Sequence, residues 1–270
     1  MSNNPLITAT DISGRNVIVT GATSGIGQGI AEALAHSGCN VLINGLGERD
    51  QIEAYCRELA ASTGSAIFYS DADMAKPDQI EAMFLQAREE LGSIDGVVNN
   101  AGVQHISAIE DFPTSQWDLI LAVNLSSAFH TTRLAFAEMK ARGWGRIINI
   151  GSAHSLMASP FKSAYVAAKH GLFGLTKTAA LEGAEHGVRV NMICPGYVRT
   201  PLVNNQIADT ARARNMSEED VIRKVMLEAQ PTKEFVEIDE IARLTCFLMS
   251  DAARSINGAE LKIEGGWCAQ

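Results

Sequence analysis

The stretch Asn16-Val-Ile-Val-Thr-Gly21-Ala-Thr-Ser-Gly25-Ile-Gly27 decides the fold of this chain. Its β-branched start predicts a strand that is buried on both faces. A glycine-rich turn follows, and then an alanine-rich helical segment that ends before Gly38. A strand, a glycine turn and a helix N-terminus together predict a cradle for a diphosphate, because bare backbone allows close approach and free N–H groups meet the anion. The glycines alone would also suit a tight turn with close helix packing, but both flanks favour a dinucleotide.

The same alternation of short apolar strands and longer helical segments continues along the chain. It predicts right-handed parallel crossovers, and hence an α/β fold of the Rossmann type: one doubly wound parallel sheet with helices on both faces. Further strands are expected at residues 40–44, 65–70, 94–99, 146–150, 189–194 and 260–263. Helices are expected at residues 49–62, from 77 onward, and at 114–142, 163–186 and 238–250.

Two segments lie outside this alternation. Residues 1–12 form a polar N-terminal extension, and residues 13–270 are expected to be a single dinucleotide-binding and catalytic domain. Within that domain, residues 201–230 are polar and weakly amphipathic, with charges on most faces. An insertion of this kind is either surface decoration or a lid, and we expect a helical substrate lid.

Composition restricts the class of partner. The 270 residues carry a formal net charge of −9, which argues against nucleic acid or an anionic membrane and leaves a small molecule. The five cysteines and six histidines show no metal-ligand spacing, so we expect no metal and reduced thiols in a cytoplasmic protein. The N-terminus lacks the features of a signal peptide, and no apolar run is long enough to span a bilayer.

A second stretch, from Gly151-Ser-Ala-His154 to Tyr165-Val-Ala-Ala-Lys169, carries candidate chemistry. On a helix Tyr165 and Lys169 are one turn apart on the same face. A phenol titrates near pH 10 and an adjacent ammonium favours the phenolate, so we expect Lys169 to lower the pKa of Tyr165. Ser152 can donate to the same reacting oxygen. A buried tyrosine beside a surface lysine is the alternative, and the dinucleotide cradle favours proton transfer to or from an alcohol.

Several separate motifs in the same order resemble the short-chain dehydrogenase/reductase family, over nearly all of residues 13–267. They are Thr20 to Gly27, Asn99-Asn-Ala-Gly102, Asn124, Ser152, Tyr165-x-x-x-Lys169 and Pro195-Gly196. The resemblance implies a homotetramer and a catalytic tetrad of Asn124, Ser152, Tyr165 and Lys169, in which Asn124 holds a water that relays the proton outward. Without the resemblance, Asn124 would be read as satisfying helix backbone at a bend.

The resemblance also implies which residues meet the cofactor. These would be Gly21, Thr23, Ser24, Gly25, Ile26, Gly27, Asp73, Met74, Asn100, Ala101, Gly102, Tyr165, Lys169, Pro195, Gly196 and Val198. We expect NAD rather than NADP, because Glu48 in the turn after the second strand would repel a 2′-phosphate. The neighbouring Arg49 weakens that preference, and the usual acidic residue at the strand end is missing.

Within the family, the sequence is similar to members that oxidise short 3-hydroxy carboxylates, with (R)-3-hydroxybutyrate and acetoacetate as the leading pair. That similarity implies substrate contacts from Gln104, Ser152, His154, Lys162, Tyr165, Tyr197, Gln206 and Trp267. Lys162 would supply the charge for a carboxylate, and Tyr197 replaces the family's usual tryptophan, which predicts a roomier pocket. The alternatives are a reductase of 3-oxoacyl thioesters, another small-alcohol dehydrogenase, and a dinucleotide-sensing protein without catalysis.

Overall fold

The computed structural model describes residues 12–269 except 201–202, 204–206, 208–210 and 213–214. In this part of the chain seven parallel strands form one sheet in the order β3-β2-β1-β4-β5-β6-β7. They are β1 (Asn16–Val19), β2 (Asn40–Asn44), β3 (Ile67–Ser70), β4 (Gly96–Asn99), β5 (Gly145–Ile150), β6 (Val188–Pro195) and β7 (Glu260–Ile263). The order reverses between β1 and β4, which opens a crevice at the carboxyl ends of these strands. The predicted fold class is confirmed.

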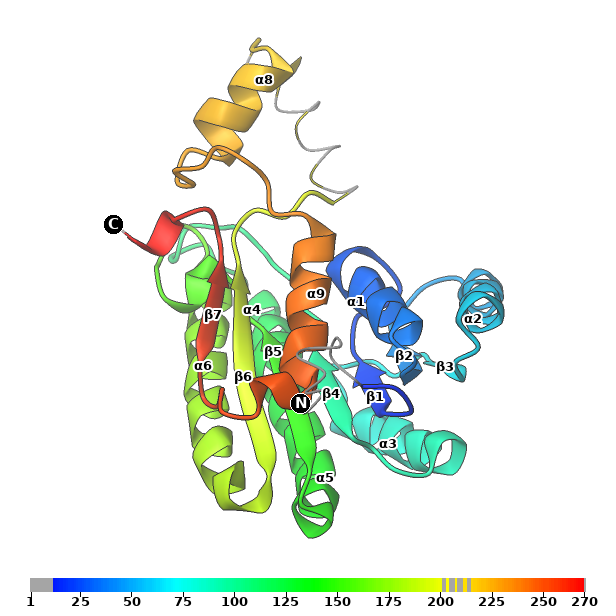
Figure 1. Ribbon diagram of the computed structural model, residues 1–270. Helices are drawn as coiled ribbons and strands as arrows, with labels where there is room; N and C mark the ends of the chain where they lie inside the picture. Colours follow the sequence, from blue (N-terminus) through cyan, green and yellow to red (C-terminus); the bar gives the residue numbers. More distant parts are fainter. Residues whose placement is uncertain (1–11, 201–202, 204–206, 208–210, 213–214, 270) are drawn as a thin grey trace, which may run out of the picture.

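Helices cover both faces of this sheet (Figure 1). One face carries α1 (Gly25–His36), α2 (Arg49–Thr63) and α9 (Ile238–Met249), and the other carries α3 (Pro77–Leu91), α5 (Ser127–Arg142) and α6 (Ser163–Gly183). Alternation along β1 explains the two cores, because Val17 and Val19 belong to the first and Ile18 to the second. The strand β1 is thus apolar on both sides.

One expected helix is built differently. Residues 114–142 were predicted as one α-helix, but α4 (Thr114–Leu121) and α5 are joined by a π-helical turn at Ala122–Ser126. A π turn inserts one extra residue into the helical register, which apolar periodicity does not reveal. The helix expected to reach residue 186 ends at Gly183 and continues as a 3-10 turn.

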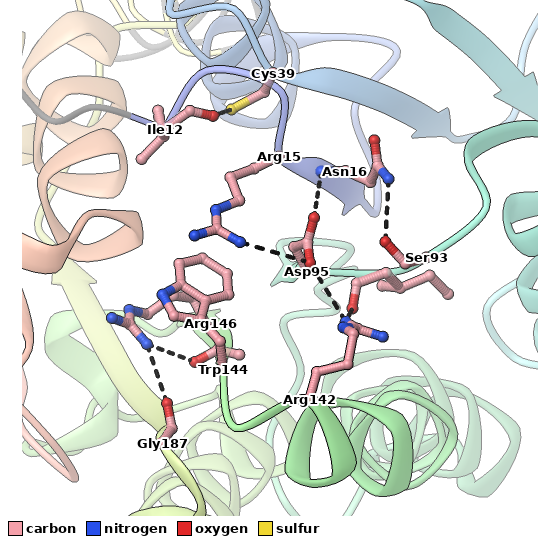
Figure 2. Close-up of polar contacts among 12 residues, drawn as sticks. Ile12, Arg15, Asn16, Cys39, Ser93, Asp95, Arg142, Trp144, Arg146 and Gly187 are labelled. Carbon is pink, nitrogen blue, oxygen red and sulfur yellow. Dashed lines mark hydrogen bonds and ion pairs between the residues drawn. The ribbon is translucent and has the colours of Figure 1, made fainter.

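Charged groups and one indole ring cover the amino-terminal ends of the central strands (Figure 2). Asp95 lies 3.9 Å from the Arg15 guanidinium and 3.4 Å from that of Arg142. The Trp144 ring lies between two guanidinium groups, with the carbon of Arg15 3.7 Å and that of Arg146 4.4 Å from its centroid. These side chains contact one another, and the terminal nitrogens of Arg146 donate to the Gly187 carbonyl and to Asp251. The groups at this end of the sheet therefore serve packing, and the candidate site lies at the carboxyl ends of the strands.

The described residues of the 201–230 segment lie beyond the carboxyl ends of the strands, where Figure 1 shows α8 (Glu218–Val221). They form a small apolar cluster in which Ile207, Ala211 and Val221 are buried and Phe235 packs against them. The segment therefore has a core of its own, although its sequence shows charges on most faces. Its position is the one a lid requires, and its closure over a substrate stays a prediction.

Candidate active site

The glycine turn after β1 has the geometry of a phosphate cradle. Gly21 and Gly25 have φ angles of +62° and +57°, a region that side chains disfavour. A Cβ on Gly27 would lie 2.3 Å from the Gly21 carbonyl oxygen, and one on Gly21 would lie 2.8 Å from the Ala101 Cα. The first amides of α1 have no acceptor within the helix, so they can meet an anion. The residues present therefore fit a dinucleotide diphosphate.

Side chains from β1 and β4 hold this cradle in place. The Thr20 hydroxyl accepts hydrogen bonds from the Asn100 and Ala101 amides at 3.0 and 3.1 Å. The side-chain Nδ2 of Asn100 donates to the Thr20 and Gly21 carbonyls, each at 2.9 Å. That Asn100 lines the cofactor stays a prediction. The Asn100 side chain forms hydrogen bonds that stabilise the glycine turn.

The other expected adenine contacts lie in the loop between β3 and α3. The Asp73 carboxylate accepts a hydrogen bond from the Ala75 amide at 2.9 Å and lies 3.6 Å from the Lys76 ammonium. Met74 is buried and packs into the second core. Its backbone, rather than its side chain, is the part that could meet an adenine ring.

Helix α6 and the end of β5 bring Ser152, Tyr165 and Lys169 together. The Lys169 ammonium is buried, donates to the Ile150 carbonyl at 2.7 Å, and lies 5.7 Å from the centroid of the Tyr165 ring. Burial lowers the pKa of Lys169 to about 8. Burial raises the pKa of Tyr165, against the hydrogen bond with Ser152, which lowers it. The pKa of Tyr165 is thus raised rather than lowered as expected, because desolvation outweighs the Ser152 hydrogen bond and Lys169 is not among the groups that shift it.

Asn124 lies in the π-helical turn and is buried. Its carboxamide oxygen accepts from the Val103 amide at 2.8 Å, and its nitrogen donates to the Val103 carbonyl at 2.9 Å. Asn124 thus satisfies backbone, as the plainer interpretation expected, but the backbone is that of the loop after β4 rather than of its own helix. Its role in holding a water stays a prediction.

His154 connects the tetrad to a residue that the sequence did not suggest. Its ring nitrogens lie 3.4 Å from the Ser152 hydroxyl (Nδ1) and 2.8 Å from the Ser159 hydroxyl (Nε2). Burial, aided by the charges of Lys162 and His170, lowers the pKa of His154 to about 4. Near neutral pH the ring is therefore uncharged, with one donor and one acceptor nitrogen. Ser159, His154, Ser152 and Tyr165 form one polar chain.

Aromatic rings stand beside this chain. The ring of Trp267 lies 5.2 Å from His154 in an edge-on arrangement and stacks on Tyr197 at 5.6 Å, with an angle of 6° between planes. The Tyr197 amide donates to the side chain of Gln230, which is fully buried. Gln230 anchors the backbone after Pro195-Gly196, and no sequence signal singled it out.

The remaining residues that we expect to bind substrate differ in how far they are buried. Lys162 is the N-cap residue of α6 and is half-buried. Burial lowers its pKa, and among the described residues it has no carboxylate partner. The Gln104 side chain is exposed, and Gln206 lies outside the described residues. A half-buried ammonium without a counter-charge, beside a neutral histidine, is suited to an anionic ligand.

Known proteins resemble this chain over nearly its whole length. A model of the family described as enoyl-(acyl carrier protein) reductase matches residues 21–268. The D-beta-hydroxybutyrate dehydrogenase of Rhizobium meliloti (strain 1021) is 54% identical, over 95% of this chain and 99% of that protein. The D-beta-hydroxybutyrate dehydrogenase of Cupriavidus necator is 51% identical, over 96% and 100%. The crystal structure of L-sorbose reductase from Gluconobacter frateurii, complexed with NADPH and L-sorbose, has a TM-score of 0.91 and 27% identity, covering 97% of this chain and 99% of that one.

Matches of this extent settle the class: the chain belongs to the short-chain dehydrogenase/reductase family. It is an oxidoreductase that works with a pyridine nucleotide. The described residues were also compared with what a membrane span and a metal site require. None of their helices is long and apolar enough to cross a membrane, and no three of their His, Cys, Asp or Glu side chains gather as a metal site would require.

Proposed function

We propose that this chain catalyses the reversible oxidation of (R)-3-hydroxybutyrate to acetoacetate with NAD. The observation that carries the proposal is the Lys162 ammonium, which lies half-buried beside the neutral His154 and has no described carboxylate partner. The names of the two relatives that are more than half identical support the same substrate. A protein with a net charge of −9 admits an anion only where its pocket supplies positive charge.

Each group at the reacting end of the site has its own role in the oxidation. The dinucleotide, when bound on the glycine turn, accepts a hydride. Tyr165 takes the hydroxyl proton while the hydrogen on the substrate carbon leaves with its electron pair, so that a carbonyl forms. The positive charge of a bound nicotinamide would offset the burial that raises the pKa of this phenol. Ser152 donates its one hydroxyl hydrogen to the substrate oxygen. Lys169 adds positive charge next to the phenol, and Asn124 holds the loop through which the proton leaves by way of a water.

The carboxylate of the substrate is held at the other end. Lys162 forms a charge-assisted hydrogen bond with the carboxylate, and Gln104 donates to a remaining lone pair. His154 donates its single N–H from Nδ1, while Nε2 accepts from the Ser159 hydroxyl. We include Gln206 from the lid in this set, so that anion binding and lid closure are coupled. Trp267 and Tyr197 provide the apolar wall, and Tyr197 admits a longer alkyl chain than a tryptophan would.

The assembly we propose is a homotetramer of cytoplasmic subunits. A groove on the outer side of α5 and α6 has a volume of about 470 Å³ and is lined by Phe129, Phe136 and Leu175 together with polar side chains. Phe129 is 48% exposed in the single chain, a large apolar surface to leave in water. Light scattering of the purified protein at micromolar concentration measures the mass, and a monomer would contradict the assembly.

The substrate proposal is tested by replacing Lys162 with alanine and comparing the free acid with its methyl ester. The loss of a charge-assisted hydrogen bond, worth roughly 1.5–3 kcal/mol, predicts a tenfold to hundredfold rise in KM for the acid. The ester, which carries no charge there, should hardly respond. Lys177→Ala, which removes an exposed lysine from the same helix, is the matched control. Equal losses for acid and ester, or a wild type that prefers 3-oxoacyl thioesters, would contradict the proposal and favour the thioester reductase.

A further inference from the structure

We infer that Asp71 and Glu53 determine the cofactor preference of this chain by holding the guanidinium of Arg49 away from the 2′ position of the adenosine ribose. The inference rests on the proposed use of NAD. It concerns the described residues at the carboxyl ends of β2 and β3 and in the first turns of α2. It names groups that the sequence had not suggested as part of the site.

The end of β2 lacks the group that usually selects NAD. An acidic residue about 20 positions after the glycine turn accepts the ribose 2′-hydroxyl in many dinucleotide-binding folds. Here the strand ends at Asn44, whose side chain turns inward and donates to the Ser70 and Ala72 carbonyls at 3.2 and 2.8 Å. Gly45 follows, where a Cβ would lie 2.6 Å from the Thr23 hydroxyl. No carboxylate is therefore available at the strand end for the ribose.

Arg49 stands close to this strand end. Its guanidinium lies over the Tyr69 ring, 5.5 Å from the centroid, and the Tyr69 hydroxyl donates to the Gly45 carbonyl at 2.9 Å. Arginine is the side chain that accommodates a 2′-phosphate in enzymes that use NADP. Taken alone, the missing acid and the nearby arginine would favour NADP.

Two carboxylates form ion pairs with the Arg49 guanidinium instead. One terminal nitrogen of Arg49 forms an ion pair with Asp71 at 2.5 Å, and the other forms one with Glu53 at 3.2 Å. The carboxylates come from different elements, Asp71 from the residue after β3 and Glu53 from the next turn of α2, and the Tyr69 ring lies beside the same guanidinium. A phosphate would have to displace both carboxylates and approach them closely, so like-charge repulsion adds to the cost of binding it.

The size of the effect follows from the exposure of these pairs. The side chains of Arg49, Glu53 and Asp71 are 55%, 41% and 61% exposed. Ion pairs in such surroundings are weak and are screened by salt. We therefore expect removal of the Asp71 charge to raise affinity for NADPH by roughly two- to fivefold, with a smaller gain at high ionic strength. Binding of NADH should change less than twofold.

The test uses the full chain with Asp71→Asn and measures dissociation constants for NADH and NADPH by fluorescence titration. Adding Glu53→Gln should increase the gain for NADPH, and adding Arg49→Gln to Asp71→Asn should cancel it. Asp78→Asn, which removes an exposed carboxylate from the start of α3, is the matched control for net charge. Circular dichroism and a melting curve establish that each variant is folded.

An unchanged ratio of NADH to NADPH affinity in Asp71→Asn would overturn the inference. So would a gain that survives Arg49→Gln or that Asp78→Asn reproduces, because the effect would then be one of general charge. A wild type that binds NADPH more tightly than NADH would overturn both this inference and the proposed cofactor. The titration needs no substrate, so its result is independent of whether the enzyme oxidises 3-hydroxybutyrate.

Discussion

Replacing Ser159 with alanine tests whether the hydroxyl next to His154 contributes to substrate binding. Ser159 lies on the far side of His154 from the tetrad, 2.8 Å from Nε2, while Nδ1 lies 3.4 Å from the Ser152 hydroxyl. The ring is neutral near pH 7 because burial lowers its pKa to about 4. Which nitrogen carries the proton is then decided by the partners of the ring, and Ser159 is the nearer of the two described here.

The magnitude follows from one hydrogen bond between a buried, neutral imidazole and a half-buried hydroxyl. Such a bond contributes about 0.5–1.5 kcal/mol, so kcat/KM for the free acid should fall roughly two- to tenfold. Most of the loss should appear in KM, because Ser159 acts through the group that binds the carboxylate rather than through Tyr165. The value of kcat/KM for the methyl ester should fall less, because the ester lacks the carboxylate to which His154 would donate.

Steady-state kinetics on acid and ester separate this positioning role from simple destabilisation. Ser159→Thr keeps the hydroxyl and should restore most of the KM for the acid, whereas a purely structural contribution would not distinguish the two substrates. The reasoning would be refuted by an alanine variant with wild-type KM for the acid. It would also be refuted if alanine and threonine had the same effect.

The glycine turn of the candidate cofactor site could be predicted because its determinants are local. The positive φ angles of Gly21 and Gly25 and the close approach at Gly27 arise within seven residues of one another. Tyr165 and Lys169 share a helix face by their spacing alone. The sheet follows from alternation, although β3 starts at Ile67 rather than at residue 65, because a hydrogen-bonded ladder rather than an apolar run defines a strand.

The substrate half depends on contacts between distant parts of the chain. Tyr197 stacks on Trp267 across 70 positions, and Gln230 reaches the Tyr197 amide from 33 positions away. No periodicity or spacing encodes such pairs. The pKa of Tyr165 shows a further limit, since the sequence places Lys169 one helical turn away but does not reveal the burial that raises this pKa.

Two further outcomes are expected. Tyr165→Phe should nearly abolish turnover and leave NADH binding intact, because the ring still packs while no group takes the proton; residual activity above a few per cent would identify another base. The second concerns stability against acid: the pKa of His154 falls from 6.5 to about 4 on folding, so the unfolded chain binds its proton first. The free energy of unfolding should therefore decrease as pH drops from 6.5 towards 4, by at most roughly 3 kcal/mol from this group. His154→Asn lacks that titration, and urea unfolding at pH 7 and 4.5 should show a smaller loss than in wild type; equal losses would exclude His154 as the source.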